Sequence, residues 1–473
     1  MANHRHQNGN DHKESQVAVV MVPLPAQGHL NQLLHLSRFV SAASIPVYYV
    51  GYATHIRQAK LRVHGWNPST TANVHFQEFP PIPFRNPSPD PNQSNKFPSQ
   101  LIPSVCATLH LRDPFYKFVS QLSSNFRRVV VVYDSFMSYV VQDIGSLQNT
   151  ESYCFRCVPA FTVYSFHWEA AGRPDDVPAE AAAVLKEIPG LDGVFSPEFD
   201  EFRRIQNGSR KIFSGDIYNS SRAIENFYLD LVAERKITGT EKLWAVGPFN
   251  PVVFPEKKGS RTRHECLDWL DRQSPNSVIF VSFGTTSSLS NEQVQELAFG
   301  LERSQQKFVW VVRDADKGDI FTGEVRKSEL PEGLEERVKE RGIIVRDWAP
   351  QLEILGHPST AGFMSHCGWN SCIESIGMGV PMATWPMHSD QPVNAVFVNK
   401  VLRIGVEVKD WGRRDEVVPS STVEDAVRRL MASEEGDEMR NRAQELGAAV
   451  RNSVMEGGSS SKEMDSFITH IIR

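Results

Sequence analysis

The sequence predicts an α/β fold with two Rossmann-like, doubly wound domains that face each other across a cleft. Three observations support this prediction. The chain has 473 residues, which is more than one ordinary hydrophobic core accommodates. Short valine-rich runs alternate with helical patterns, as in βαβ units. This alternation occurs twice, on either side of a segment at 244–265 that is rich in proline and charge, as interdomain linkers are.

Continuous apolar runs predict the strands of the N-terminal half, because strands buried on both faces of a parallel sheet have no polar side. These runs are residues 17–23, 46–51 and 128–134. Between the first two, Leu30, Leu33 and Leu34 recur at helical spacing and complete a βαβ unit. Prolines at 78–104 remove backbone donors, so a long surface loop is expected there, while 170–240 shows no clear pattern.

The C-terminal half repeats the pattern of strands and helices. Its expected strands are residues 277–284, 307–312 and 342–348. Two capping boxes predict helix starts, because a serine and a glutamate or glutamine three residues later satisfy free backbone N–H groups. The boxes are Ser290 with Gln293, and Ser421 with Glu424. The expected organisation is therefore an N-terminal domain at 1–250 with a disordered start at 1–15, a linker at 251–265 and a C-terminal domain at 266–463.

Composition limits the partners and the location of the chain. A net charge of −6 and a pI near 6.2 argue against nucleic acid or an anionic membrane as the main partner. The polar start has no apolar core of a signal peptide, and no uncharged apolar run of about 18 residues follows, so we expect no membrane span. Six cysteines in so long a chain do not form a disulfide scaffold, which favours a cytoplasmic location.

Residues 364–391, MSHCGWNSCIESIGMGVPMATWPMHSDQ, place many polar side chains between apolar ones. A metal site is not expected, because the histidines and cysteines lack the spacing with which one short turn aims two ligands at an ion. No G-x-S-x-G nucleophile elbow is present, and SFGTTSS at 282–288 lacks the G-x-G-x-x-G spacing of a dinucleotide turn. The remaining interpretations are a buried polar network and a bound ligand.

The ligand interpretation explains more of the polar residues. Residues 362–375 follow the order strand, glycine-bearing turn and helix. Backbone N–H groups at such a helix start are unpaired and favour an anion. His366, Asn370 and Ser371 add side-chain donors beside them. The turn therefore predicts a diphosphate site that uses no metal.

The other parts of a nucleotide sugar find suitable residues nearby. Trp348 follows a strand end and offers a flat face to a base. Glu374 lies one turn into the helix and is able to accept hydrogen bonds from the two hydroxyls of a ribose. Asp390 and Gln391 follow another expected strand, PMATWP, in a loop suited to the hydroxyls of a sugar.

A second pair of residues suggests proton transfer. His29 is expected in the loop after the first strand, where α/β sheets place ligands, and Asp134 ends another buried strand of the same sheet. A carboxylate on one imidazole nitrogen fixes the tautomer and leaves the other nitrogen free to accept a proton. The alternative is a histidine on the surface with no such role.

Residues 348–391, WAPQLEILGHPSTAGFMSHCGWNSCIESIGMGVPMATWPMHSDQ, closely resemble the signature box of plant UDP-sugar-dependent glycosyltransferases of small molecules. Within that family the chain is most similar to the zeatin O-glucosyltransferases, through segments spread over most of its length. These segments are PAQGHLNQLLHLSR, VGYATHIRQA, GDIYNSSR, VGPFNP, ADKGDIF and VRDWAPQLEIL. The resemblance implies the two-domain GT-B fold and an inverting transfer without a metal or another cofactor.

The resemblance also implies roles for individual residues. His29 is the general base and Asp134 its partner, although YDSFMS after the strand departs from what many family members carry. The donor residues are implied by motif match: Trp348 and the Ala349 backbone for uracil, Gln351 and Glu374 for ribose, His366, the Trp369 backbone, Asn370, Ser371, Ser282 and Thr285 for diphosphate, and Asp390 and Gln391 for glucose.

The resemblance further implies a monomer whose co-substrate is UDP-glucose, or UDP-xylose as in close relatives, and whose acceptor is the hydroxyl of zeatin. Flavonoids, isoflavones and other phenolics are the alternative acceptors. The acceptor pocket is expected from the N-terminal half, and 464–473 is expected to return to that domain as a helix. Two other classes are a non-catalytic UDP-sugar-binding protein and a phosphorylase-like enzyme, for which no cofactor lysine motif is present. The candidate acceptor segments are 80–104, 106–115 and 161–168.

Overall fold

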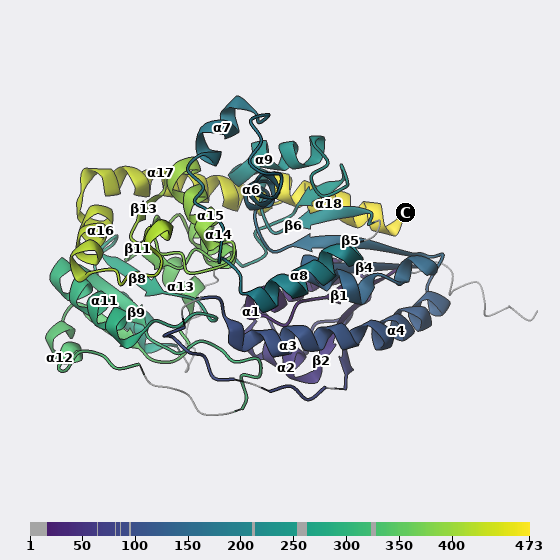
Figure 1. Ribbon diagram of the computed structural model, residues 1–473, viewed down its shortest axis with the longest axis horizontal. Coiled ribbons are helices and arrows are strands. Elements are labelled where there is room, and N and C mark those ends of the chain that lie inside the picture. The colour runs from purple at the N-terminus through teal and green to yellow at the C-terminus, as the bar shows by residue number, and fades with distance from the viewer. Residues whose placement is uncertain are drawn as a thin grey trace, which may run out of the picture.

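The structure is a computed structural model in which two lobes lie side by side (Figure 1). It describes residues 17–63, 65–80, 82–85, 87–93, 96–210, 213–252, 263–322 and 328–473. The expected disordered start at 1–15 and most of the expected linker lie outside the described residues.

Each lobe contains one parallel sheet, which establishes the predicted α/β class with two Rossmann-like domains. The N-terminal sheet has the strand order β3-β2-β1-β4-β5-β6-β7 and the C-terminal sheet the order β10-β9-β8-β11-β12-β13. In both sheets the order reverses beside the first strand, and ligands of doubly wound folds bind at this point. In the N-terminal sheet the reversal lies between β1 and β4, and in the C-terminal sheet between β8 and β11.

The described part of the N-terminal lobe consists of these strands and longer helices: β1 (Val17–Val22), α1 (Gln27–Ala42), β2 (Val47–Tyr52), α2 (Ala53–Arg62), β3 (Val74–Phe79), α3 (Ile102–Ala107), α4 (Arg112–Asn125), β4 (Arg128–Asp134), α5 (Ser138–Val141), β5 (Thr150–Arg156), α6 (Ala160–Ala170), α7 (Ala179–Leu185), α8 (Pro197–Ser209), β6 (Gly215–Tyr218), α9 (Arg222–Glu234) and β7 (Leu243–Ala245).

The C-terminal lobe and the final helix contain α10 (Glu265–Leu270), β8 (Val278–Ser282), α11 (Asn291–Ser304), β9 (Lys307–Val311), α12 (Leu334–Val338), β10 (Gly342–Val345), α13 (Gln351–Leu355), β11 (Thr360–Ser365), α14 (Trp369–Met378), β12 (Met382–Thr384), α15 (Gln391–Val396), β13 (Gly405–Glu407), α16 (Ser420–Ala432), α17 (Glu434–Val454) and α18 (Ser459–Ile472).

Alternation of side chains along the buried strands builds two apolar layers in the N-terminal lobe. Val19 and Met21 of β1 pack in the cluster that contains the leucines of α1, whereas Val20 and Val22 pack in the cluster that contains Phe115 of α4. All residues of β1 are buried, as the continuous apolar run predicted. Helices therefore cover both faces of the sheet and leave its carboxyl edge for polar residues.

The final helix α18 lies against the N-terminal sheet, beside β5 and β6 in Figure 1. Phe467 contacts the rings of Tyr153 and Trp244 edge to face, at centroid distances of 5.4 and 5.3 Å. The chain thus crosses from the C-terminal lobe back to the N-terminal one. Among the helices that the structure describes, none combines the length and the apolar character needed to cross a bilayer.

Three sequence-based expectations about elements need correction. The strand expected at 342–348 ends at Val345. The proline-rich loop ends before Ser99, where a 3₁₀ turn and then α3 begin, because proline is tolerated in the first turn of a helix. Ser421 does not cap α16, since Glu296 of α11 accepts the Ser420 backbone N–H at 2.5 Å instead.

Among the other elements, one helix start was predicted correctly, and one strand and one helix were not predicted. Ser290 caps α11 as predicted, with its Oγ accepting the Gln293 backbone N–H at 3.2 Å. Strand β5 and helix α6 were not predicted, because their polar and aromatic residues match neither simple period. The missed strand matters for the site, since Cys157 follows it directly.

Candidate active site

His29 and Asp134 meet at the reversal point of the N-terminal sheet. The Nδ1 atom of His29 lies 2.6 Å from Oδ2 of Asp134. His29 is not in a loop, as expected from the sequence, but in the first turn of α1, which begins at Gln27. Strands β1 and β4 pair in register, so the helix that follows β1 starts beside the last residue of β4. The His29 side chain is 24% exposed and Asp134 is fully buried.

The surroundings of Asp134 favour its carboxylate form. Its Oδ1 accepts the Phe136 backbone N–H at 2.9 Å, and its Oδ2 accepts the Cys157 thiol at 3.0 Å. Burial by itself would raise the pKa of Asp134, but His29 and these donors hold it below its ordinary value. Burial by itself would lower the pKa of His29. The attraction of the Asp134 charge outweighs the effect of burial, so the pKa of His29 is raised above its ordinary value. In this pair the Asp134 carboxylate polarises the His29 imidazole through Nδ1, and Nε2 is the nitrogen that can accept a proton.

His29, Asp134 and the neighbouring Cys157 carry atoms that metals bind. The ligand atoms of His29, Asp134 and Cys157 lie within 4.8 Å of one another, a grouping that no other such side chains make among the residues that the structure describes. Two ligands at about 2.0 Å from a tetrahedral ion stand roughly 3.3 Å apart. The 2.6 Å separation of Nδ1 and Oδ2 is shorter, so the geometry fits a hydrogen bond rather than shared coordination.

The predicted strand–turn–helix lies at the reversal point of the C-terminal sheet. β8 and β11 pair up to Ser282 and Ser365, so the turns that follow them are adjacent. The His366 ring lies between these turns, and a Cβ at Gly284 or Gly368 would stand 2.6 Å from it. Gly284 also has φ of 75°, so glycine is required there twice over.

His366 is buried, and its Nδ1 has no hydrogen-bond partner among the described residues. Burial lowers its pKa to about 4, so the ring is neutral near pH 7. An orphaned polar atom beside a helix start is unusual unless a ligand completes it. Gly368 at the N-terminus of α14 provides no side-chain cap, which leaves the first N–H groups of that helix for a ligand as well.

Three predicted donor-site residues form one hydrogen-bonded group. Gln351 Nε2 donates to Glu374 Oε2 at 2.7 Å and to Ser371 Oγ at 3.2 Å. Burial raises the pKa of Glu374 to about 7, and the Gln351 hydrogen bond acts in the opposite direction. The group joins the start of α13 to the first turns of α14, so the two segments that carry it are held together.

Two of the three tryptophans of the signature box, Trp348 and Trp369, differ in environment. Trp348 is 42% exposed, unusual for so large an apolar ring, while Trp369 is buried. The Trp369 Nε1 donates to the Asn219 carbonyl oxygen at 2.8 Å, so this indole ties α14 to the N-terminal lobe. The Ala349 carbonyl oxygen already accepts the Gln351 backbone N–H at 2.8 Å.

Asn370 also contacts the N-terminal lobe, so its side chain is hydrogen-bonded rather than free for a ligand. Its Nδ2 donates to the Gly28 carbonyl oxygen at 2.9 Å, and its Oδ1 accepts from the Gln32 amide. A Cβ at Gly28 would stand 3.0 Å from Asn370 Nδ2, so the two helix starts approach closely. The segment expected to bind a diphosphate and the helix of His29 are thereby in direct contact.

Asp390 and Gln391 start α15 at the carboxyl end of β12. Asp390 accepts from Asn394 Nδ2 at 2.6 Å, and its negative charge contributes to raising the pKa of His29. Gln391 is buried, and its Oε1 accepts the backbone N–H groups of Met387 and His388 at 2.9 and 3.1 Å. Asp390 therefore lies on the side of the C-terminal lobe that faces the dyad, whereas the Gln391 oxygen is already engaged within its own lobe.

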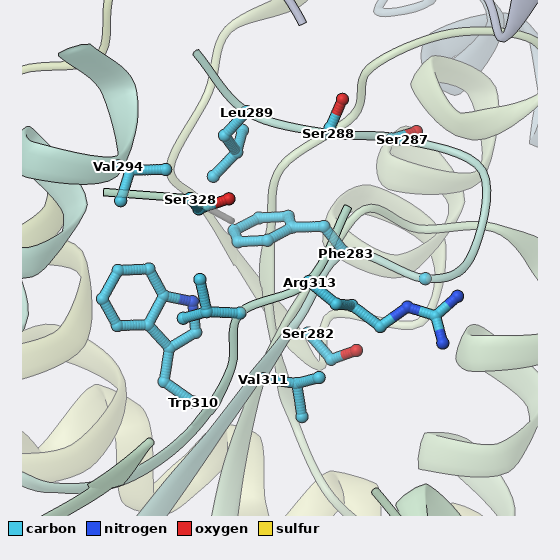
Figure 2. Close-up of a pocket in the computed structure, with 12 residues that line it drawn as sticks. Ser282, Phe283, Ser287, Ser288, Leu289, Val294, Trp310, Val311, Arg313 and Ser328 are labelled. Atoms are coloured by element: carbon cyan, nitrogen blue, oxygen red, sulfur yellow. The ribbon is translucent and has the colours of Figure 1, made fainter. Parts of the chain in front are cut away.

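Ser282 and Thr285 lie at the carboxyl end of β8. Ser282 ends the strand and lines a small pocket, which Figure 2 shows with Phe283, Trp310 and Arg313 around it. Thr285 does not line that pocket, and its carbonyl oxygen accepts the Asp316 backbone N–H at 2.7 Å. The pocket lies at the carboxyl ends of β8 and β9, which Ser282 and Val311 end.

Several site residues were missed by the sequence interpretation. Cys157 follows an unpredicted strand, and a lone cysteine carries no motif. Gln32 and the ion pair between Arg62 and Asp316 join the lobes, and only tertiary contact reveals them. His388 is one of the histidines that the sequence interpretation considered only as metal ligands. In the structure its Nε2 lies 2.9 Å from Ser287 Oγ, and burial lowers its pKa to about 3.

Comparison with known proteins agrees with this geometry. Residues 15–251 match the family model described as "Glycosyltransferase, N-terminal domain", and 258–434 match that of "UDP-glucoronosyl and UDP-glucosyl transferase". The chain is 54% identical over 459 residues to zeatin O-glucosyltransferase of Phaseolus lunatus, covering 97% of each chain. The chain belongs to the plant UDP-glycosyltransferase family. This UDP-glycosyltransferase is also 52% identical to zeatin O-xylosyltransferase of Phaseolus vulgaris, covering 97% of its own chain and 99% of that relative.

Solved structures support the GT-B fold of this UDP-glycosyltransferase. A UGT transferase from Siraitia grosvenorii in complex with UDP has a TM-score of 0.76 and 27% identity, over 97% of this chain and 100% of that one. The protein is therefore an enzyme that transfers a sugar from a UDP-sugar donor to small plant metabolites.

Proposed function

We propose that this glycosyltransferase moves glucose from UDP-glucose to the side-chain hydroxyl of zeatin, with inversion at the anomeric carbon and without a metal. His29 is the general base and Asp134 orients it. The hydrogen bond of 2.6 Å between them supports the mechanism, since it joins a partly exposed imidazole to a fully buried carboxylate. The names of the two Phaseolus relatives support zeatin as the acceptor.

The catalytic step follows from that pair. The acceptor hydroxyl gives its proton to His29 Nε2 while its oxygen attacks the anomeric carbon, and UDP departs from the opposite face. An α-linked donor thereby yields a β-glucoside. Asp134 stabilises the imidazolium that forms. A positioned base accelerates such a step about 10²–10⁴-fold, equivalent to about 3–5 kcal/mol of barrier.

The donor is proposed to lie along the carboxyl edge of the C-terminal sheet. Trp348 stacks on uracil, with the Ala349 backbone pairing to its edge, and Gln351 and Glu374 hold the ribose. The diphosphate takes the open N–H groups at the start of α14, whose dipole favours an anion. The other diphosphate contacts come from His366, Asn370, Ser371, Ser282 and Thr285. The orphaned Nδ1 of His366 supports this, because a phosphate oxygen would supply a partner.

The sugar is proposed to lie between the two lobes, held by Asp390 and Gln391. Asp390 supports this placement, because its charge reaches His29 electrostatically and the reacting carbon must lie near that base. The oxygen of Gln391 is engaged, so its amide NH₂, which also lies 3.3 Å from both ring nitrogens of His388, is the group proposed for a sugar hydroxyl.

The division of labour between domains completes the proposal. The N-terminal domain, 1–250 together with the returning 464–473, binds the acceptor, and 266–463 binds the donor across the 251–265 linker. The proposed enzyme acts as a monomer, as the resemblance to its family implies. The six free thiols favour the reducing conditions of the cytoplasm.

The test is product analysis by mass spectrometry. Purified enzyme receives UDP-glucose or UDP-xylose with trans-zeatin, cis-zeatin, a flavonol or an isoflavone. We expect O-glucosylzeatin as the main product. If no zeatin product forms but a phenolic is glucosylated, the acceptor is a phenolic and not zeatin. If xylosylzeatin is the main product instead, the donor is UDP-xylose and not UDP-glucose. Tight UDP-glucose binding with no product from any pair would indicate a non-catalytic sensor instead. His29→Ala should bind UDP normally and lose at least about 100-fold in turnover.

A further inference from the structure

Asp134 has a second side-chain partner besides His29. The Cys157 thiol donates to Oδ2, the same oxygen that faces His29 Nδ1, with a sulfur–oxygen distance of 3.0 Å. Cys157 is 8% exposed and follows the last residue of β5, next to β4 in the sheet. One carboxylate oxygen is therefore shared between the proposed base and a buried thiol.

The thiol remains protonated in this position, so it acts as a donor. Burial raises the pKa of Cys157 well above its ordinary value, and the nearby Asp134 charge raises it further. A thiol that donates to Oδ2 withdraws negative charge from the oxygen that attracts the imidazolium. It also restricts rotation of the carboxylate, whose Oδ1 is already held by the Phe136 N–H.

We propose that Cys157 is a positioning residue of this glycosyltransferase, whose thiol holds the Asp134 carboxylate and moderates the basicity of His29. The inference rests on the proposed dyad. Without the thiol, Oδ2 attracts the imidazolium more strongly, the base stays protonated to higher pH, and less enzyme is active near neutrality. A residue that merely filled space would leave the pH dependence of catalysis unchanged.

Other titratable groups that face the dyad do not account for such a change. Tyr49 and Cys154 are buried, and burial raises the pKa of both, that of Cys154 to about 11, so both stay neutral in the working range. The third is Asp390, across the lobe boundary, whose pKa burial raises. It is present in every variant compared below and contributes equally to all of them.

The experiment is the pH profile of kcat/KM with UDP-glucose and trans-zeatin, or quercetin if product analysis ranks it first. Cys157→Ala should move the acid limb up by about half a pH unit, because one hydrogen bond is exchanged for none. At the midpoint of the wild-type limb this lowers kcat/KM about twofold. Cys157→Ser keeps a donor and should return the limb toward the wild-type position.

Cys154→Ala is the matched control, since Cys154 is a buried thiol in β5, three residues before Cys157. Its limb should match the wild type. An unmoved limb in Cys157→Ala, or an equal shift in Cys154→Ala, overturns the inference. If Cys157→Ala does not fold, Cys157→Ser provides the test. An acid limb of Cys157→Ser that lies about half a pH unit above the wild-type limb also overturns the inference.

His29→Ala separates this inference from the proposed function. If His29→Ala is inactive and the Cys157 variants have the wild-type limb, only the role of Cys157 fails. If His29→Ala retains full activity, the dyad itself fails, and the role of Cys157 falls with it.

Discussion

The side-chain amide of Asn370 donates to the carbonyl oxygen of Gly28 over 2.9 Å, although the two residues lie 342 positions apart. Gly28 precedes His29 in the first turn of α1, and Asn370 lies in the first turn of α14. The helix start proposed for the diphosphate therefore touches the helix that carries the proposed base. The contact between the lobes therefore also involves the first turn of the helix that carries the proposed base.

The contact between these helices is expected to affect catalysis. Gln32 donates to the Asn370 side chain from the N-terminal lobe, so Gln32→Ala removes one bond across the lobes without altering the signature box. A net hydrogen bond corresponds to about a 2- to 10-fold change. We expect kcat/KM for UDP-glucose to fall by that factor in steady-state kinetics. Gln142→Ala, which removes an amide that bonds within its own turn, should have no effect; equal losses in both variants would contradict the prediction.

The rate should depend on pH through His29. The base must be neutral to accept a proton, and the Asp134 charge holds the pKa of His29 above 6.5. Activity is therefore lost as pH falls through this raised pKa, so the acid limb of kcat/KM lies above pH 6.5. Asp134→Asn removes the charge while burial still lowers the pKa, so the limb should move down and the plateau should drop at least about 100-fold. A limb that stays in place would show that another group titrates.

Uracil stacking on Trp348 predicts a loss of donor affinity. Trp348 is 42% exposed, so Trp348→Ala removes little core packing. Stacking of a base on an aromatic ring contributes about 1–3 kcal/mol, so Kd for UDP should rise about 5- to 150-fold in calorimetry. Leu61→Ala, at a residue 66% exposed, is the control for removing an exposed apolar side chain. Unchanged UDP affinity in Trp348→Ala would place the uracil elsewhere.

A buried ion pair should support the N-terminal sheet. Arg156 Nε lies 2.7 Å from Asp216 Oδ1, and both side chains are almost fully buried. Asp216→Ala leaves the guanidinium without its partner, which costs about 3–5 kcal/mol and corresponds to a fall of about 10 °C in Tm. Differential scanning calorimetry measures the shift. The exposed pair of Arg204 and Glu201 is the control, since Glu201→Ala should change Tm by a degree or two at most. Similar shifts for both variants would contradict the prediction.

The strands and the signature segment could be predicted because their signals are local. The valine-rich runs of β1 and β4 show burial on both faces, and the turn after β11 shows its glycine and its polar donors in adjacent positions. Such patterns need only the period of a strand and the chemistry of a helix start. His29 and Asp134 could be suggested as partners for the same reason, since each follows or ends a buried parallel strand.

The sequence by itself determined the α/β class, the presence of two Rossmann-like domains and the residue types that we propose for the nucleotide sugar. Only the tertiary structure decided that His29 lies in a helix, that Cys157 shares Oδ2 of Asp134, that Asn370 contacts Gly28 and that Glu296 caps α16. The physical reason is distance along the chain. Strand and helix periods arise between residues a few positions apart, whereas these contacts join segments that meet only after the sheets form and the lobes pack together.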